Sequence, residues 1–378
     1  MKIKIVSTYP PTKCGIAEHA KQLVDSLKKT GIEPEIVEIK KPTTANPFYF
    51  LKLAKEAAKG TSKKDIIHIQ FHLSIFGRFL YILPGLYFIF FLAWLKLLTR
   101  AKIVVALHDS PSRELAMEGG KKEKFLFYYN KFIYIFLKLF VDKFITHSKK
   151  GEEINMKEWK INPKKTITLP LGLPVNIIKL NKAKAKSEIG YPKKQILLLL
   201  GFIRNSKNYG VVLDSLKKLD KNVILLIAGK PQTEKDKKAV EDILKKTEEL
   251  KLKDRVHVLG FVSDEKMPAL LNAADVAIIL HTQGGGDFLS STMAMQLAYN
   301  IPLLSTNIPS FENLKKEEKC IETFIENDAS DLANKIKNLL NNKSEINYLK
   351  TQSQKYWDKN NWNEIGKRTK EMYLSLFK

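Results

Sequence analysis

Residues 195–229, QILLLLGFIRNSKNYGVVLDSLKKLDKNVILLIAG, decide the fold of this chain. An apolar run, QILLLL, is followed by a turn containing glycine, a stretch with helical spacing, and a second apolar run, VILLIA. Strands buried on both faces lose the alternation of apolar and polar residues, so two such runs joined by a helix predict neighbouring parallel strands.

The same alternation of apolar, strand-like runs and helical segments extends in both directions along the chain. The other strand candidates are IKIVST, EPEIVEI, DIIHIQ, KIVVALH, KFITHS and KTITLPLG before this stretch, and RVHVLGF, VAIIL and PLLST after it. Helices are expected over about 17–29, 211–218, 233–250 and 266–273. A chain of 378 residues is too long for one ordinary domain. A second series of alternating strands and helices begins after a lysine-rich stretch near residue 190. We predict an α/β protein with two doubly wound, Rossmann-like domains facing a cleft, over 1–180 and 190–354.

Composition indicates a globular protein with an anionic partner. The net charge is +24 and nearly all of the excess is lysine. This charge fits nucleic acid, a membrane surface or a phosphorylated substrate, or simply solvated helix faces. The opening MKIKIVSTYPP has too short an apolar run for a signal peptide, so we expect a cytoplasmic protein.

Two segments of the first domain carry unusual apolar character. Residues 79–95, FLYILPGLYFIFFLAWL, contain no charge and are interrupted by Pro-Gly. They fit a membrane-spanning helix, a buried core helix or a helix that dips into a membrane surface. Residues 124–140, KFLFYYNKFIYIFLKLF, carry Lys124, Lys131 and Lys138 at heptad spacing among aromatic residues. That pattern is typical of an interfacial helix, and equally of a core helix whose lysines reach out to solvent.

Four loops at strand ends hold the candidate site residues. Gly15 opens a helix whose first amides can meet a phosphate, although many strand–helix turns carry glycine. His108 ends a strand, where a histidine is as often structural as functional. Arg204 and Lys207 lie three residues apart and suit a diphosphate, or form a solvated basic loop. Residues 284–292, GGGDFLSST, lead into a helix expected to start near Phe288 and offer amides and hydroxyls to an anion.

In their order and spacing these motifs resemble the retaining glycosyltransferases of family 4 (group 1), which have the GT-B fold. The resemblance runs over almost the whole chain, through STYPPTKCGIAEH, HIQFHLSIFG, VVALHD, GFIRNSKNYG, VHVLGFVSDEKMPALLNAADVAIIL, NIPLLSTNIPSF and WNEIGKRTKEMY. It implies that the last helix, about 355–378, crosses back to the first domain.

The resemblance also implies roles for single residues. Arg204 and Lys207 would neutralise the donor diphosphate, His108 would touch the donor sugar, and Asp287 would bond its hydroxyls. Phe261 and Val262 would hold the base. The remaining donor contacts would be Gly15, Ile16, Gly201, Gly229, Gly286, Phe288, Leu289, Ser290 and Ser291. Many members carry a second acid eight positions after the first. Met295 stands there in this chain, which puts the ribose contact in doubt.

The function predicted from these residues is transfer of a hexose from a nucleotide-sugar such as UDP- or GDP-hexose, with retention of configuration and no cofactor. The sequence holds no Asp-x-Asp pair and no histidine or cysteine cluster with ligand spacing, so metal-independent transfer is expected. A lipid or polyprenyl-linked acceptor at an anionic membrane surface would explain the apolar and lysine-rich helices. The alternatives are a degenerate GT-B scaffold, a nucleotide-sugar epimerase or a phosphorylase. Nucleic-acid binding is not expected, because the lysines are dispersed.

Overall fold

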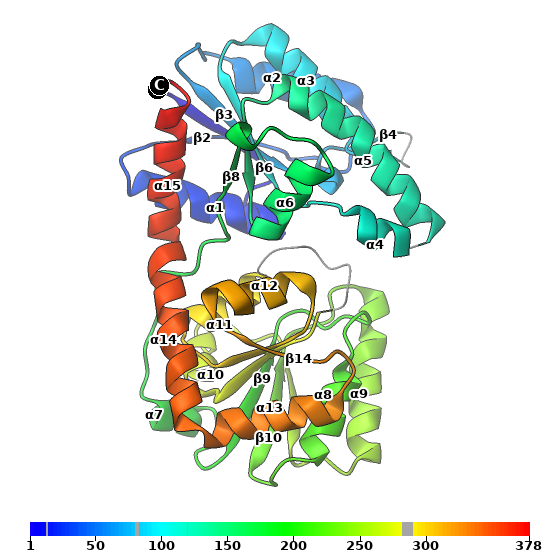
Figure 1. The fold of residues 1–378 in the computed structure, drawn as a ribbon, viewed down its shortest axis with the longest axis vertical. Coiled ribbons are helices and arrows are strands. Elements are labelled where there is room, and N and C mark those ends of the chain that lie inside the picture. Colours follow the sequence, from blue (N-terminus) through cyan, green and yellow to red (C-terminus); the bar gives the residue numbers. More distant parts are fainter. Residues whose placement is uncertain (13, 80–82, 119, 282–289) are drawn as a thin grey trace. The chain divides into compact units, whose positions relative to one another are not determined.

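The computed structural model describes residues 1–12, 14–79, 83–118, 120–281 and 290–378. Of these, residues 1–172 and 360–378 form one compact unit, here unit 1, and 173–281 and 290–359 form unit 2. Each unit contains one six-stranded, all-parallel sheet with helices on its faces (Figure 1). The predicted α/β class with two doubly wound sheets is therefore confirmed.

Unit 1 has the strand order β2-β1-β3-β6-β7-β8. Its strands are β1 (Ile3–Ser7), β2 (Glu35–Glu38), β3 (Ile66–Phe71), β6 (Lys102–Leu107), β7 (Lys143–Thr146) and β8 (Thr166–Thr168). Its helices are α1 (Gly15–Lys28), α2 (Pro47–Ala58), α3 (Tyr87–Leu98), α4 (Arg113–Glu118), α5 (Lys121–Phe140), α6 (Lys149–Lys157) and α15 (Trp362–Ser375), with short 3₁₀ turns at Leu73–Ile75 and Pro163–Lys165. The order reverses between β1 and β3, which makes the loops after these two strands the edge where ligands bind in such sheets.

The two faces of this sheet differ in chemistry. Helices α2, α3 and α5 bury aromatic and aliphatic side chains against one face, including Phe50, Phe88 and Phe91. Helices α1 and α15 pack together, and a Cβ on Gly366 would lie 2.8 Å from the Ser26 carbonyl oxygen. The strand residue beneath α15 is His68, whose Nδ1 lies 2.6 Å from the Tyr373 hydroxyl. A buried polar contact therefore helps to hold the C-terminal helix on unit 1.

The apolar stretch 79–95 is not one helix. Arg78–Phe79 (β4) pairs with Leu83–Pro84 (β5) as a two-stranded hairpin, and α3 begins only at Tyr87. Glycine permits this, because Gly77 and Gly85 both have positive φ and a Cβ on either would collide with neighbouring atoms. Within the described residues, no helix is long and apolar enough to cross a membrane.

Unit 2 has the strand order β11-β10-β9-β12-β13-β14, the classical order of dinucleotide-binding sheets. Its strands are β9 (Gln195–Leu200), β10 (Val223–Ala228), β11 (Val256–Gly260), β12 (Val276–Ile279), β13 (Leu303–Thr306) and β14 (Glu322–Phe324). Its helices are α7 (Lys182–Glu188), α8 (Tyr209–Lys217), α9 (Lys237–Glu249), α10 (Met267–Ala273), α11 (Ser291–Ala298), α12 (Pro309–Glu318), α13 (Ala329–Asn341) and α14 (Lys343–Asn360), with a 3₁₀ turn at Glu234–Asp236. In this order β9 and β12 are neighbours, so the switch point lies between them.

Buried polar side chains of unit 1 are linked to one another by hydrogen bonds. The Gln70 amide nitrogen lies 3.2 Å from His68 Nε2, and its oxygen lies 2.5 Å from His108 Nε2. An amide donates only through nitrogen and accepts only through oxygen, so His108 carries its proton on Nε2 and His68 on Nδ1. The His19 ring packs edge-on against the rings of His108 and His147. Burial lowers the pKa of all four imidazoles, that of His68 to about 3.

We expect unit 1 to lose stability as the pH falls below about 6.5. These histidines are neutral in the folded protein and bind protons readily only when unfolded. Their contribution is therefore complete above their unfolded pKa of about 6.5 and declines below it, by about 1.4 kcal/mol per pH unit for each histidine. Thermal melts between pH 7.5 and 5.0 measure this slope. His68→Gln should give a shallower slope than the wild type, and an unchanged slope would contradict the interpretation.

Candidate functional site

The candidate site lies at the carboxyl edge of the unit 2 sheet, where β9 and β12 end. Gly201 follows β9 with φ +118° and Gly229 follows β10 with φ +156°, both in the region that favours glycine. A Cβ on Gly229 would collide with the Gly201 carbonyl oxygen, and a Cβ on Gly201 would lie 3.0 Å from Thr292 Cγ2. The two glycines thus let the β9 and β10 loops and the start of α11 approach closely.

The loop after β9 presents two cations. The Arg204 side chain is exposed and forms no ion pair with any residue that the structure describes. Lys207 is half-buried, and its ammonium donates to the Phe202 carbonyl oxygen over 3.0 Å. Burial, with a smaller effect of the Arg204 charge, lowers the pKa of Lys207 to about 8. Among the described residues, neither cation has a carboxylate partner, and two such positive groups favour binding of an anion here.

His281, which sequence reasoning did not single out, lies at the end of β12 beside this loop. Its backbone N–H donates to Thr306 Oγ1 over 2.7 Å, and that hydroxyl donates back to the His281 carbonyl oxygen over 2.8 Å. The ring packs edge-on against Phe311, at 5.3 Å between centroids. Burial and the charges of Lys207 and Arg204 lower the pKa of His281 to about 4, so the imidazole is neutral at pH 7. Its position directly after VAIIL was the signal that could have found it.

Helix α11 begins at Ser291 and not near Phe288 as expected from the sequence. Ser290 is the N-cap, and its hydroxyl accepts from the Met293 N–H over 3.2 Å and contacts Thr292 Oγ1. The short polar side chain satisfies a free amide of the first turn and thereby fixes the start of the helix. Asp287, Gly286, Phe288 and Leu289 lie outside the described residues.

The remaining unit 2 candidates lie on the same edge or close to it. Phe261 follows β11 and is 73% exposed, with the Lys230 ammonium 6.0 Å from its ring centroid. Val262 beside it is half-buried. Met295 is half-buried on α11, and its thioether offers no strong acceptor to a ribose hydroxyl. Unit 2 therefore brings Gly201, Arg204, Lys207, Gly229, Phe261, Val262, Ser290 and Ser291 to strand ends and the first turn of α11.

Three predicted residues lie at the carboxyl edge of the unit 1 sheet. Gly15 and Ile16 begin α1, which is capped by the Cys14 side chain accepting from the Ala17 N–H. His108 is only 7% exposed, and its Nε2 is occupied by Gln70. The more accessible histidine is His72, whose Nε2 lies 2.9 Å from Asp109 Oδ2 and whose Nδ1 accepts from the Ser74 N–H. Sequence reasoning named His108 and missed His72, because spacing does not reveal which strand-end histidine is covered.

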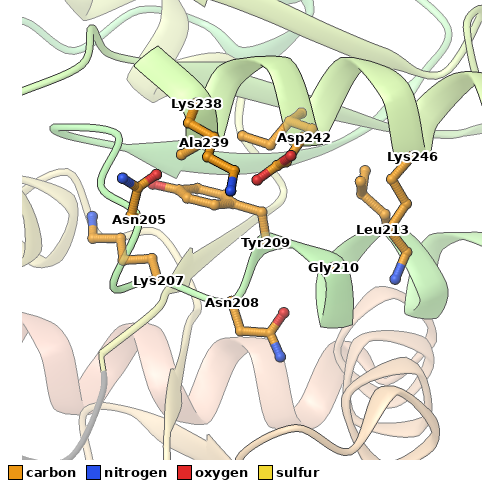
Figure 2. Close-up of a pocket in the computed structure, with 11 residues that line it drawn as sticks. Asn205, Lys207, Asn208, Tyr209, Gly210, Leu213, Lys238, Ala239, Asp242 and Lys246 are labelled. Carbon is orange, nitrogen blue, oxygen red and sulfur yellow. The ribbon is translucent and has the colours of Figure 1, made fainter. Parts of the chain in front are cut away.

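A cavity of about 440 Å³ lies behind the cationic loop, between α8 and α9 (Figure 2). Its lining is polar, but much of that polarity is satisfied within the protein. Lys246 pairs with Asp214 at 2.6 Å, and the Asn205 amide donates to the Lys235 carbonyl oxygen over 2.7 Å. The cavity shares Lys207 with the cationic loop but is not lined by Arg204, so we expect it to be a poorer anion site than the strand ends.

Replacing Gly229 by alanine should disturb this edge. The new Cβ would meet the Gly201 carbonyl oxygen at a backbone angle that L-residues rarely adopt, and such strain typically costs about 1–3 kcal/mol. We expect a lower free energy of unfolding in urea and weaker binding of UDP. Gly190→Ala is the control, because Gly190 has positive φ but open space around it. Equal effects of the two substitutions on UDP binding would contradict the proposed close approach.

The comparisons with known proteins agree with this geometry. Residues 181–360 match the family described as glycosyl transferases group 1. Anabaena HepE in complex with UDP is similar in structure, with a TM-score of 0.75, 15% identity and coverage of 99% of this chain and 100% of that one. A glycosyltransferase from Rickettsia africae has a TM-score of 0.75, 17% identity and coverage of 100% and 99%. WaaG, a glycosyltransferase of lipopolysaccharide biosynthesis, has a TM-score of 0.67, 13% identity and coverage of 98% and 99%.

A search of curated proteins gave no significant match. The structural likeness covers both units, and the family match covers nearly all of unit 2. Residues 181–360 are thus similar to the group 1 glycosyltransferases, and the chain has the GT-B fold that its sequence predicted.

Proposed function

We propose that this chain transfers a hexose from a nucleotide-sugar to an acceptor, with retention of configuration. The observation that carries the proposal is a pair of cations, Arg204 and Lys207, at the switch point of the unit 2 sheet, neither of which forms an ion pair with a residue that the structure describes. The family match of this unit supports the same activity. Because HepE structures contain UDP and UDP-glucose, we propose a UDP-hexose as the first donor to test.

Transfer develops negative charge on the leaving diphosphate. Arg204, Lys207 and the first-turn amides of α11 would stabilise that charge, and fixed groups of this kind each contribute about 2.7–4 kcal/mol to catalysis in well-studied cases. Neutral His281 would add a hydrogen bond without adding a charge. We propose that these protein groups replace a divalent ion, so that transfer proceeds without metal or cofactor. Asp287, with Gly286, Phe288 and Leu289, is proposed to hold the donor sugar, and Phe261 and Val262 the base.

The unit 1 candidates keep their proposed roles with one refinement. Gly15 and Ile16 are proposed to present the first amides of α1 to the donor. Nε2 of His108 is held by Gln70, so direct contact with a sugar hydroxyl would use Nδ1, the acceptor nitrogen of this tautomer. We propose that His108 touches the donor sugar through Nδ1 while the bond from Nε2 to Gln70 fixes the orientation of its ring.

Titration with UDP, GDP and ADP tests the donor site. We expect saturable binding of one nucleotide and at least about tenfold weaker binding by Arg204→Ala, because a charge-assisted contact to phosphate is lost. Arg100→Ala removes an exposed arginine before β6 and serves as the control. Failure to bind any nucleotide would contradict the proposal. Nucleotide binding without turnover of any hexose donor would instead favour the degenerate scaffold.

We further propose a lipid-linked acceptor at the cytoplasmic surface of an anionic membrane. Helices α3 and α5 pack against each other, and each buries one side and exposes large apolar residues on the other. This apolar–lysine face contains Phe90, Trp94, Leu97, Leu98, Phe125, Tyr128, Phe132, Ile135 and Leu139, with exposed Lys124 and Lys131 and half-buried Lys138. Exposed apolar side chains among lysines are typical of helices that lie in a membrane interface.

Vesicle binding tests this part of the proposal. Changing Lys124, Lys131 and Lys138 together to glutamine should weaken binding to vesicles with anionic lipid by about 100-fold, since each lysine near such a surface contributes about 1 kcal/mol. The control changes three exposed lysines of unit 2, at positions 193, 217 and 221, and removes the same charge. Unchanged binding of the first variant, or an equal loss in both, would contradict a membrane-facing role for α5.

A further inference from the structure

Asp236 holds the loop that carries the two cations of unit 2. Its Oδ1 accepts from the Asn205 N–H over 2.9 Å, and its Oδ2 accepts from the N–H and hydroxyl of Thr233 over 3.0 and 2.6 Å. The Asn205 N–H belongs to the peptide that begins at Arg204. One carboxylate therefore joins the capping box before α9 to the backbone directly after Arg204.

The backbone on the other side of Arg204 is held as well. The Arg204 N–H donates to the Tyr209 hydroxyl over 3.3 Å, and the Lys207 N–H donates to the Arg204 carbonyl oxygen over 3.1 Å. Figure 2 shows Asn205 beside the phenol end of Tyr209 at the rim of the cavity. Both peptide groups that flank Arg204 are thus held by hydrogen bonds, and among these bonds only the one to Asp236 involves an ionised group.

The charge of Asp236 acts on the same loop. Hydrogen bonds from Thr233 and Asn205, with a smaller contribution from the positive charge of Arg204, lower the pKa of this carboxyl group. Asp236 is therefore ionised at pH 7, and its negative charge offsets part of the field that the loop presents to an anion. The hydrogen bonds of Asp236 favour anion binding because they order the loop, whereas its negative charge disfavours anion binding.

We propose that Asp236 is a positioning residue for diphosphate binding, which orients the Arg204–Lys207 loop through the Asn205 N–H and limits the affinity of the loop for diphosphate. This inference rests on the proposed function, because it concerns the same anion site. A limit on affinity has a chemical use, since the nucleoside diphosphate is the product that must leave after each transfer.

Two substitutions at one position separate the two effects. Asp236→Ala removes both the acceptor and the charge, and we expect roughly two- to threefold weaker binding of inorganic pyrophosphate and of UDP, because a roughly fivefold loss from one ordering hydrogen bond is partly offset by a roughly twofold gain from the lost charge. Asp236→Asn keeps an acceptor for Asn205 and removes the charge. We expect it to bind both probes as tightly as the wild type or roughly twofold more tightly at 0.05 M salt. Calorimetric titration measures both affinities, and pyrophosphate makes the result independent of the base.

Thr233→Ala is the matched control, because it removes the hydroxyl bond to Oδ2 of Asp236 and leaves the bond from the Asn205 N–H to Oδ1 in place. It should lower the melting temperature while leaving pyrophosphate affinity unchanged, as expected if the cap and the positioning are separate. The inference is overturned if Asp236→Ala binds like the wild type, if the Ala and Asn variants weaken binding equally, or if Thr233→Ala weakens it as much as Asp236→Ala. Failure of the wild type to bind either probe would overturn the proposed function itself, and this inference with it.

Discussion

A parallel sheet that is covered on both faces can present polar side chains to ligands mainly at its ends, and this constraint organises both units. The strands of unit 2 are apolar along most of their length, as in QILLLL and VILLIA, because helices cover them on both sides. All strands run in the same direction, so their carboxyl ends share one edge. The polar residues that follow several different strands are therefore collected on that edge, although they lie far apart in the sequence.

Unit 2 uses this edge to concentrate positive charge beside a neutral imidazole. The glycines after β9 and β10 bring backbone segments close together, and no carboxylate in the described part of the chain forms an ion pair with the arginine and lysine that follow. The balancing carboxylate, Asp236, lies instead at the start of the α9 region and bonds to the loop backbone. The negative charge is thereby bonded to the loop backbone, and neither cationic side chain forms an ion pair with a described carboxylate.

Unit 1 also has a six-stranded parallel sheet, but its strand order and its interior differ from those of unit 2. The sheet face that meets α15 carries His68 and Gln70 in place of aliphatic residues, and the hydrogen bonds continue from Tyr373 to His108. A face of this kind remains stable only while its histidines are neutral, because burying charged imidazoles is costly. The opposite face is aromatic and supports α3 and α5, whose outer sides leave apolar residues exposed beside lysines.

The sequence by itself determined the α/β class, the two parallel sheets, the resemblance to group 1 glycosyltransferases, and Arg204 and Lys207 as candidates, because apolar runs and strand-end loops are local signals. It placed the start of α11 too early, and it predicted one helix where a hairpin precedes α3, since caps and close glycine contacts depend on neighbours that a periodic pattern does not contain. Only the tertiary structure decided that His281 joins the cations, that Asp236 bonds to their loop, and that His108 is covered while His72 is not. The physical reason is that β9 and β12 are neighbours in the sheet although two strands lie between them in the sequence. The spacing of residues along the chain does not reveal which strands pair.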